Sequence, residues 1–311
     1  MFNNVSHMAL AIALKQQSLS ANAPTVEAQC AHHLALLNHK SDAQRRDSLA
    51  YLTSAITSST LGSPLPQPSS VILSAVQRLI LDGSNSVRQQ LLKLLQSLPK
   101  GDIASHADQL LLHTRAGMTH LAVEIRVFAL DVLEWLLDAA ADEVVSCPGG
   151  WVKMLKCFLG LLGWQAGADG KWSGSKSSGK PWGDAKVQVK QMGTLAIFLK
   201  AGLVPHQVIT PITTGGGTFP LWQTHHHVLS QRSSVYAHLN LFGASRDDET
   251  EMYEDREDRQ RVFHEGAEPA ITTGLEHAIR GGGELGRAAA HLKKIVREGM
   301  ADYRGDEAAL Q

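Results

Sequence analysis

Cysteine, charge and long apolar runs are all scarce in this sequence. The three cysteines, Cys30, Cys147 and Cys157, are odd in number and widely separated, so neither a disulfide framework nor a zinc site is indicated. We expect buried, reduced thiols in a reducing compartment. No run approaches the roughly 18 consecutive apolar residues that a membrane-spanning helix requires, which argues against a membrane protein. The short apolar run Met8–Leu14 has no basic residue before it, so we expect no secretory signal.

Charged residues make up 19% of the 311 residues, against about 25% in typical soluble domains. We therefore expect part of the apolar surface to be covered by a partner. The formal net charge is −1, whereas a general nucleic-acid-binding protein carries a strong basic excess. This charge balance argues against a general nucleic-acid-binding protein. It is still compatible with direct RNA contact through a local basic face.

Sequence motifs for chemistry are also missing. The stretch Gly174–Pro181 is nearly a phosphate-binding loop, but Pro181 stands where that loop needs a magnesium-binding hydroxyl. The adjacent histidines His225–His227 point in different directions on any regular element, so they do not readily share one metal ion. No hydrolase, metalloprotease or dinucleotide-binding signature is present. We expect no enzyme activity, no cofactor and no bound metal.

Three segments share one pattern, an arginine followed by a small or aliphatic residue at +3 and by leucines at +4 and +7. Their members are Arg45, Leu49 and Leu52; Arg88, Leu92 and Leu95; and Arg126, Leu130 and Leu133. The arginines are 43 and 38 residues apart, close to the roughly 40 to 47 residues of HEAT and armadillo repeats.

Apolar residues in the third segment recur with helical spacing. Ile125, Phe128, Val132 and Leu133 lie on one face of a helix. One helical pair cannot bury such a face alone, so neighbouring pairs must stack. The sequence thus predicts an all-α fold, a HEAT/armadillo-like α-solenoid of stacked helical pairs. We expect the repeated arginines to bond to the adjacent repeat or to helix-end carbonyls rather than to a ligand.

Composition divides the chain into three parts. Residues 1–24 form an N-terminal extension, and residues 25–204 hold the helical repeats, interrupted by a loop at 163–184 that is rich in Gly, Ser and Lys. Residues 205–311 form a looser helical region. Its segment 247–265 has nine acidic residues against three arginines. We expect a solvated helix or a partly disordered segment there, and a docking site for a basic partner is the less favoured alternative.

Helical spacing predicts individual helices over residues 27–39, 42–58, 69–81, 85–98, 103–121, 124–145, 151–162, 187–200, 269–279 and 285–303. Trp135 lies on one of them and is expected to pack in the core. Trp172, Trp182 and Trp222 lie in loop-like surroundings, where an exposed indole often marks an interface. We take these three as partner-binding candidates.

Three stretches, Gln16–Ser20, Lys40–Leu52 and Met118–Leu133, resemble a fungal pre-rRNA-processing family. The family is named for processing of the second internal transcribed spacer and is related to the animal testis-expressed protein ten. The resemblance is strongest from about residue 16 to residue 164. Members begin with a lysine-rich leader, which this chain lacks, so an N-terminal nuclear signal or RNA-contacting tail is not carried over.

The resemblance implies a non-catalytic scaffold subunit of a nuclear Rix-type complex, needed for internal transcribed spacer processing and large ribosomal subunit maturation. It implies as partners a WD-repeat propeller subunit, a second helical-repeat subunit, precursors of the large subunit and, indirectly, an AAA-type ATPase. The shared motif is a packing motif, so it carries over no catalytic residue. The repeat alone also supports a HEAT-repeat adaptor in another pathway, because α-solenoids serve many functions.

The predicted helix register can be tested through stability. Leu133→Ala is expected to open a cavity between repeats and to lower the free energy of unfolding by about 2 to 5 kcal/mol. Thermal unfolding of the variant measures this effect, and an unchanged midpoint would contradict the register.

Overall fold

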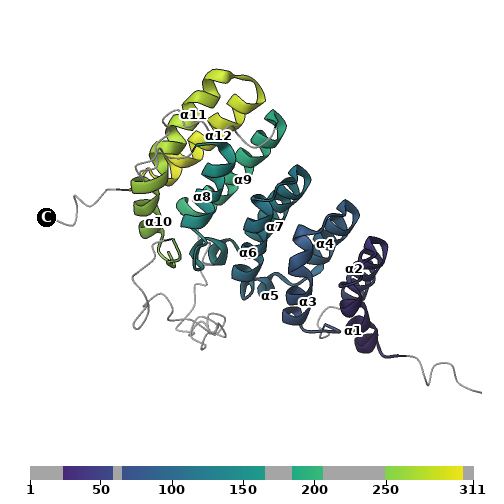
Figure 1. Ribbon diagram of the computed structural model, residues 1–311. Coiled ribbons are helices and arrows are strands. Elements are labelled where there is room, and N and C mark those ends of the chain that lie inside the picture. Colours follow the sequence, from purple (N-terminus) through teal and green to yellow (C-terminus); the bar gives the residue numbers. More distant parts are fainter. Residues whose placement is uncertain (1–23, 59–64, 165–183, 206–248, 304–311) are drawn as a thin grey trace, which may run out of the picture.

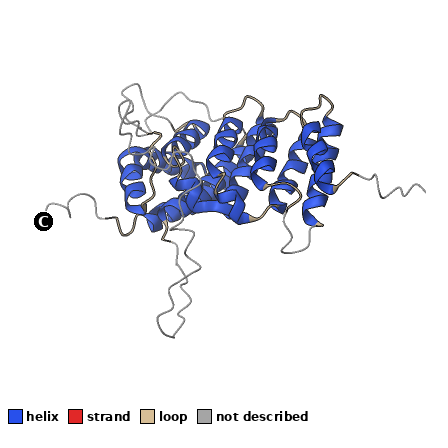
Figure 2. Ribbon diagram, turned by 90° about the horizontal axis from the view of Figure 1, so that it is seen from below, coloured by secondary structure: helices blue, strands red, loops and turns tan. Residues whose placement is uncertain are grey.

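The computed structural model describes residues 24–58, 65–164, 184–205 and 249–303. Every regular element within these ranges is helical, and they contain no strand (Figure 2). The all-α prediction is therefore confirmed for the described part of the chain. None of the described helices is both long and apolar enough to cross a membrane.

The described helices follow one another along the chain, and short connections join those from α3 to α8. Their bounds are α1 Val26–Leu36, α2 Asp42–Thr57, α3 Ser69–Val76, α4 Asn85–Ser97, α5 Lys100–Ala104, α6 Ala107–Met118, α7 Val123–Ser146, α8 Val152–Leu162, α9 Ala185–Leu203, α10 Arg256–Val262, α11 Glu268–Gly281 and α12 Gly283–Gly299. A 3-10 helix, Gln77–Leu81, extends α3, and a π-helical turn, Phe263–Ala267, joins α10 to α11.

The helices stack in a row, with α1 and α2 at one end and α11 and α12 at the other (Figure 1). Along this row α2 packs against α4, α7 against both α6 and α9, and α12 along α9. The buried apolar side chains form one continuous core. The described helices on both sides of residues 206–248 contribute to it.

Predicted and observed helices differ where local hydrogen bonds compete with the helix. The predicted helix 103–121 is divided into α5 and α6, because His106 has a non-helical backbone (φ −121°, ψ 10°). The Ser105 hydroxyl donates to the Asp102 carbonyl at this break, an alternative that short polar side chains offer to helical backbone. Helix α7 also bends, at Ala140 (φ −151°, ψ 55°), inside the predicted helix 124–145.

All three cysteines are free thiols, and Cys30 and Cys147 are buried. Cys157 is partly accessible, but burial of the sulfur raises the pKa of its thiol to about 12. Burial also raises the pKa of Cys30. A thiol with a raised pKa contains little of the reactive thiolate at neutral pH, so these cysteines act as apolar packing groups.

Trp151 joins α8, α9 and α10 at one buried point. Its side chain has no exposed surface, its ring stacks on Phe198 of α9 at 5.0 Å between centroids, and its indole Nε1–H donates to the Arg259 carbonyl at 3.1 Å. The ring lies over Gly202 so closely that a Cβ atom there would be 2.2 Å from Trp151 Cζ3. Glycine at residue 202 therefore allows the close approach of α9 to this ring.

The acidic segment contributes to the core as well as to the surface. Helix α10 begins at Arg256, and its residues Arg259 and Gln260 are buried, as is Phe263 in the π-helical turn that follows. The exposed acidic residues Glu254, Asp255 and Glu257 precede these buried positions, and Glu265 follows them. The sequence left a solvated helix and a partly disordered segment as alternatives. The structure shows a helix over residues 256–262, and one face of this helix packs against the stack.

The close contact at Gly202 predicts opposite effects for two glycines of α9. Gly202→Ala is expected to lower the free energy of unfolding by about 1 to 3 kcal/mol, because the added methyl group overlaps the Trp151 ring. Gly193→Ala is the matched control, because nothing lies within 4 Å of its added Cβ. It is expected to leave stability unchanged or to raise it by up to about 1 kcal/mol. Equal effects in chemical denaturation would contradict this packing.

Candidate interaction surface

The three repeated arginines have the same place and the same hydrogen bonds. Arg45, Arg88 and Arg126 are each the fourth residue of their helix, in α2, α4 and α7. Each guanidinium donates from one terminal nitrogen to the two backbone carbonyls five and six residues earlier, in the loop that precedes the helix. The donor–acceptor distances lie between 2.6 and 3.0 Å, and the acceptors are His39 and Lys40, Asp82 and Gly83, and His120 and Leu121.

A fourth arginine makes the same contact, and sequence analysis missed it. Arg259 is the fourth residue of α10 and donates to the carbonyls of Tyr253 and Glu254 at 2.7 and 2.6 Å. Its Nε–H also donates to the Gly202 carbonyl at 2.9 Å, which ties α10 to the end of α9. The +4 and +7 positions after Arg259 hold Phe263 and Gly266 instead of leucines. The signal that could have revealed it is the arginine at the fourth helical position, not the leucine spacing.

The repeated leucines lie in the core as their spacing requires, with one exception. Leu49, Leu52, Leu95, Leu130 and Leu133 are at most 1% exposed. Leu92 is only partly buried, because in α4 the fully buried position is Leu91, one residue earlier. Trp135 is also partly buried and packs against the core.

Polar contacts link the loops that precede α2, α4 and α7. Arg45 forms a bidentate ion pair with Asp82, at 2.8 and 3.0 Å, and the carbonyl of Asp82 accepts from Arg88. Arg88 in turn approaches the Glu124 carboxylate of the next helix at 3.9 Å. The loops before α2, α4 and α7 therefore form one connected series, which we call the arginine edge (residues 39–42, 82–85 and 120–124).

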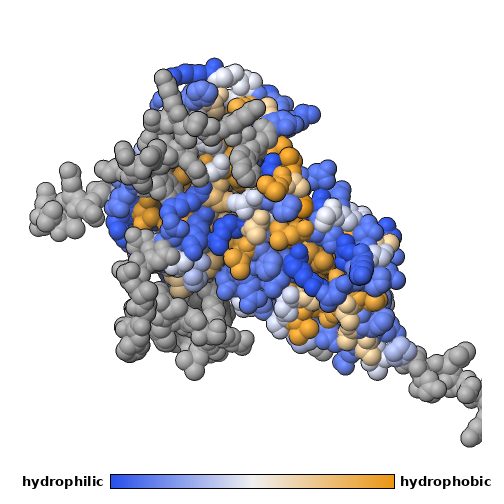
Figure 3. All heavy atoms as spheres, in the orientation of Figure 1, coloured by the Kyte–Doolittle hydropathy of each residue, from blue (hydrophilic) through white to orange (hydrophobic). Residues whose placement is uncertain are grey.

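The third loop of the arginine edge presents apolar side chains to solvent. Leu121 is 87% exposed and Val123 is 42% exposed, although the carbonyl of Leu121 is held by Arg126 at 2.8 Å. A loop that is already fixed loses little conformational freedom when a partner binds it. On the face shown in Figure 3, apolar residues lie in separate patches along the stack, with hydrophilic residues between them. Leu121 is therefore a candidate contact residue on a rigid support.

Helix α10 is held to the end of the stack by a second arginine. Arg256 donates to both carboxylate oxygens of Asp302 at 2.7 Å, and Gln260 donates to Asp302 and to the Gly299 carbonyl. The hydrogen bonds from Arg256 hold the pKa of Asp302 well below its usual range. The guanidinium also donates to the carbonyls of Leu203 and Gly299, so α9, α10 and α12 meet at these polar groups.

Several predicted positions lie outside the described residues. They are the three partner-binding candidates Trp172, Trp182 and Trp222, the Gly174–Pro181 stretch, the histidines His225–His227 and most of the N-terminal extension. The roles predicted for them stay predictions. Within the described ranges, no group of three or more His, Cys, Asp or Glu residues is arranged to hold a metal ion.

The fourth arginine yields a test of the shared contact. Arg259→Ala is expected to lower the free energy of unfolding by about 2 to 4 kcal/mol, because it leaves carbonyls without their donor in a buried place. Arg280→Ala is the control, because the Arg280 side chain on α11 is 80% exposed and its loss should change stability by no more than about 0.5 kcal/mol. Thermal unfolding that fails to separate the two variants would show that the contact does not stabilise the fold.

Comparison with known proteins places this helical chain among fungal relatives. Residues 101–199, which include α6, α7, α8 and most of α9, match a family described as a Rix1 complex component involved in 60S ribosome maturation. Over 314 residues the chain is 49% identical to the pre-rRNA-processing protein ipi1 of Sclerotinia sclerotiorum, with 98% of this chain and 90% of the relative covered. It is 49% identical to ipi1 of Aspergillus fumigatus over 309 residues, with 96% and 90% covered.

A more distant relative and a solved structure extend the comparison. The chain is 38% identical over 311 residues to IPI1 of Chaetomium thermophilum, with 96% of this chain and 88% of the relative covered. A chain of a structure described as the Rix1-Rea1 pre-60S particle has a TM-score of 0.46 and 24% identity, covering 66% of this chain and 76% of that one. Because its sequence is 49% identical to the Sclerotinia and Aspergillus relatives over nearly its whole length, the chain belongs to the family of the pre-rRNA-processing protein ipi1.

Proposed function

We propose that this chain is a non-catalytic scaffold subunit of a nuclear Rix-type complex, required for internal transcribed spacer processing and for maturation of the large ribosomal subunit. The observation that carries the proposal is the 49% identity to a pre-rRNA-processing protein over 98% of the chain. Over the central helices it is supported by the match to a family described as a component of the Rix1 complex. Nuclear localisation follows from the site of pre-rRNA processing.

The architecture fits a scaffold of the HEAT or armadillo class. Each of α2, α4 and α7 repeats the same arginine contact with its preceding loop, and each packs against its neighbours in the row. Such a stack exposes a long surface relative to its core, which suits simultaneous contact with several partners. We assign Arg45, Arg88 and Arg126, with their leucines, as repeat-defining residues rather than ligand-binding ones.

We infer the partners from the family. They are a WD-repeat propeller subunit, a second helical-repeat subunit, precursors of the large subunit and, through these, an AAA-type ATPase. Leu121 on the arginine edge is our candidate contact for a protein subunit, because it is an exposed leucine on a fixed loop. It also lies within residues 101–199, which match the family description. A HEAT-repeat adaptor in another pathway is the alternative function.

Purification of the tagged full chain from its own cells separates the two functions. The proposed function predicts recovery of a WD-repeat subunit, a second helical-repeat subunit and large-subunit precursors, identified by mass spectrometry. Recovery of an unrelated set of proteins would favour the adaptor instead.

A charge introduced at Leu121 tests the arginine edge in the same purification. Leu121→Asp is expected to reduce recovery of at least one partner by about fivefold or more, as for an interface residue of substantial effect. Its stability should change by no more than about 0.5 kcal/mol, because the site is exposed. Val26→Asp is the matched control, because Val26 is also exposed, at 55%, and lies on α1 at the end of the stack. Equal recovery with both variants would exclude Leu121 from the interface.

A further inference from the structure

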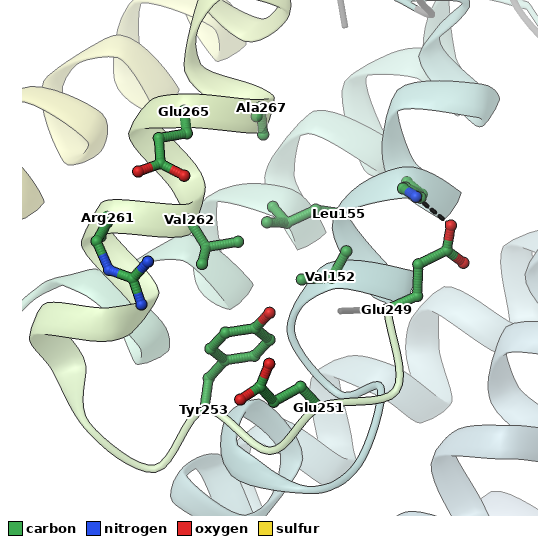
Figure 4. A pocket seen from close by; sticks show the side chains of 11 residues that line it. Val152, Leu155, Glu249, Glu251, Tyr253, Arg261, Val262, Glu265 and Ala267 are labelled. Atoms are coloured by element: carbon green, nitrogen blue, oxygen red, sulfur yellow. Dashed lines mark hydrogen bonds and ion pairs between the residues drawn. The ribbon is translucent and has the colours of Figure 1, made fainter. Parts of the chain in front are cut away.

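A pocket of about 390 Å³ lies between α8 and the segment that leads into α10. Val152, Leu155 and Lys156 of α8 line one side. The other side is formed by Glu249, Glu251 and Tyr253, by Arg261 and Val262 of α10, and by Glu265, Gly266 and Ala267 of the π-helical turn. Figure 4 shows these side chains arranged around the opening. None of these residues belongs to the arginine edge, and Tyr253 takes part in the arginine contact only through its carbonyl, which accepts from Arg259.

The wall of the pocket is apolar. Val152, Leu155 and Val262 face one another across it, with the Tyr253 ring below them in the view of Figure 4. Leu155 and Tyr253 are buried and belong to the core, at 2% and 5% exposure. The wall is therefore a fixed surface against which an aliphatic chain can pack.

The rim of the pocket carries more negative than positive groups. Lys156 is already paired with Glu249, and Arg261 is paired with Asp258 at 2.8 Å. Glu265 is exposed, and its carboxylate makes no hydrogen bond or ion pair within the described part of the chain. Both lining cations are thus already paired with acids, while one carboxylate at the opening keeps its full capacity to accept hydrogen bonds.

The combination of an apolar wall and an acidic rim selects one kind of occupant. A phosphate backbone is repelled by the carboxylates, and a purely apolar side chain leaves Glu265 without a partner. An arginine side chain satisfies both parts, because its aliphatic stem packs on apolar surface while its guanidinium forms a bidentate pair with a carboxylate. The same stretch of the chain also holds Glu254, Asp255 and Glu257, which are exposed, and its acidic character favours a basic partner.

We propose that this pocket binds an arginine side chain on a basic and apolar segment of a partner protein, with Glu265 pairing the guanidinium and Val152, Leu155 and Val262 holding its stem. The segment lies along the acidic surface of residues 249–265. This site is independent of the proposed function, since it depends only on the shape and charge of the pocket.

Binding of a defined peptide to the full-length chain tests the pocket. The probe is a fluorescein-labelled peptide of alternating arginine and leucine, and its binding is followed by fluorescence anisotropy. Replacing arginine by glutamate in the peptide is expected to abolish binding. Glu265→Arg in the protein should weaken binding by about fivefold or more, because an attractive pair becomes a repulsive one. Raising the salt concentration should weaken it further.

A matched control separates the pocket from overall charge. Glu298→Arg makes the same change in net charge on an exposed site of α12 that does not line the pocket, and it should alter binding by less than about twofold. Val262→Thr keeps the charge but replaces one methyl group of the wall by a hydroxyl, and it should weaken binding of the arginine peptide.

Three results would overturn the proposal. The first is equal binding by the Glu265→Arg and Glu298→Arg variants, with both folded as judged by circular dichroism. The second is the absence of peptide binding at any salt concentration. The third is binding that occurs only after Lys171, Lys176 and Lys180 are replaced by serine, which would identify the chain's own basic segment as the occupant.

Discussion

The contact between an arginine and two carbonyls of its own preceding loop is the interaction on which the rest of this structure depends. A loop that leads into a packed helix brings backbone carbonyls close to the core, where an unpaired acceptor is unfavourable. One guanidinium satisfies two such carbonyls from a fixed position in the helix, and the planar fork leaves its remaining donors for a neighbour. At Arg45 the neighbour is Asp82 of the following loop, so the contact also sets the spacing of adjacent helices.

Arg259 makes the same contact, although no leucines follow it at the +4 and +7 positions. Arg259 holds the loop before α10 and also reaches Gly202 at the end of α9. Its own carbonyl accepts the indole N–H of Trp151, and Trp151 in turn lies on Gly202. Three helices from distant parts of the chain are fixed relative to one another in this way. The pocket between α8 and α10 has a defined shape because both of its sides are attached to this junction.

The proposed scaffold function depends on the surfaces that the chain presents to its partners. Membership of the ipi1 family connects the chain with pre-rRNA processing and 60S maturation. Two of its described surfaces are the contact sites that we propose. The arginine edge offers an apolar side chain on a fixed loop, and the pocket offers an apolar wall with an acidic rim. These surfaces differ in charge and in shape, so they suit different partners.

The sequence by itself determined the helical class, most helix positions and the importance of Arg45, Arg88 and Arg126, because apolar periodicity and residue spacing are local properties of a chain. It also carried enough family-specific residues, from Met118 to Leu133, to indicate ribosome assembly. Only the tertiary structure decided that Arg259 is their equivalent, that Gly202 must be glycine and that Glu265 stands beside an apolar wall from α8. These features join residues far apart in the sequence, and a spacing rule cannot identify which distant segments will pack together.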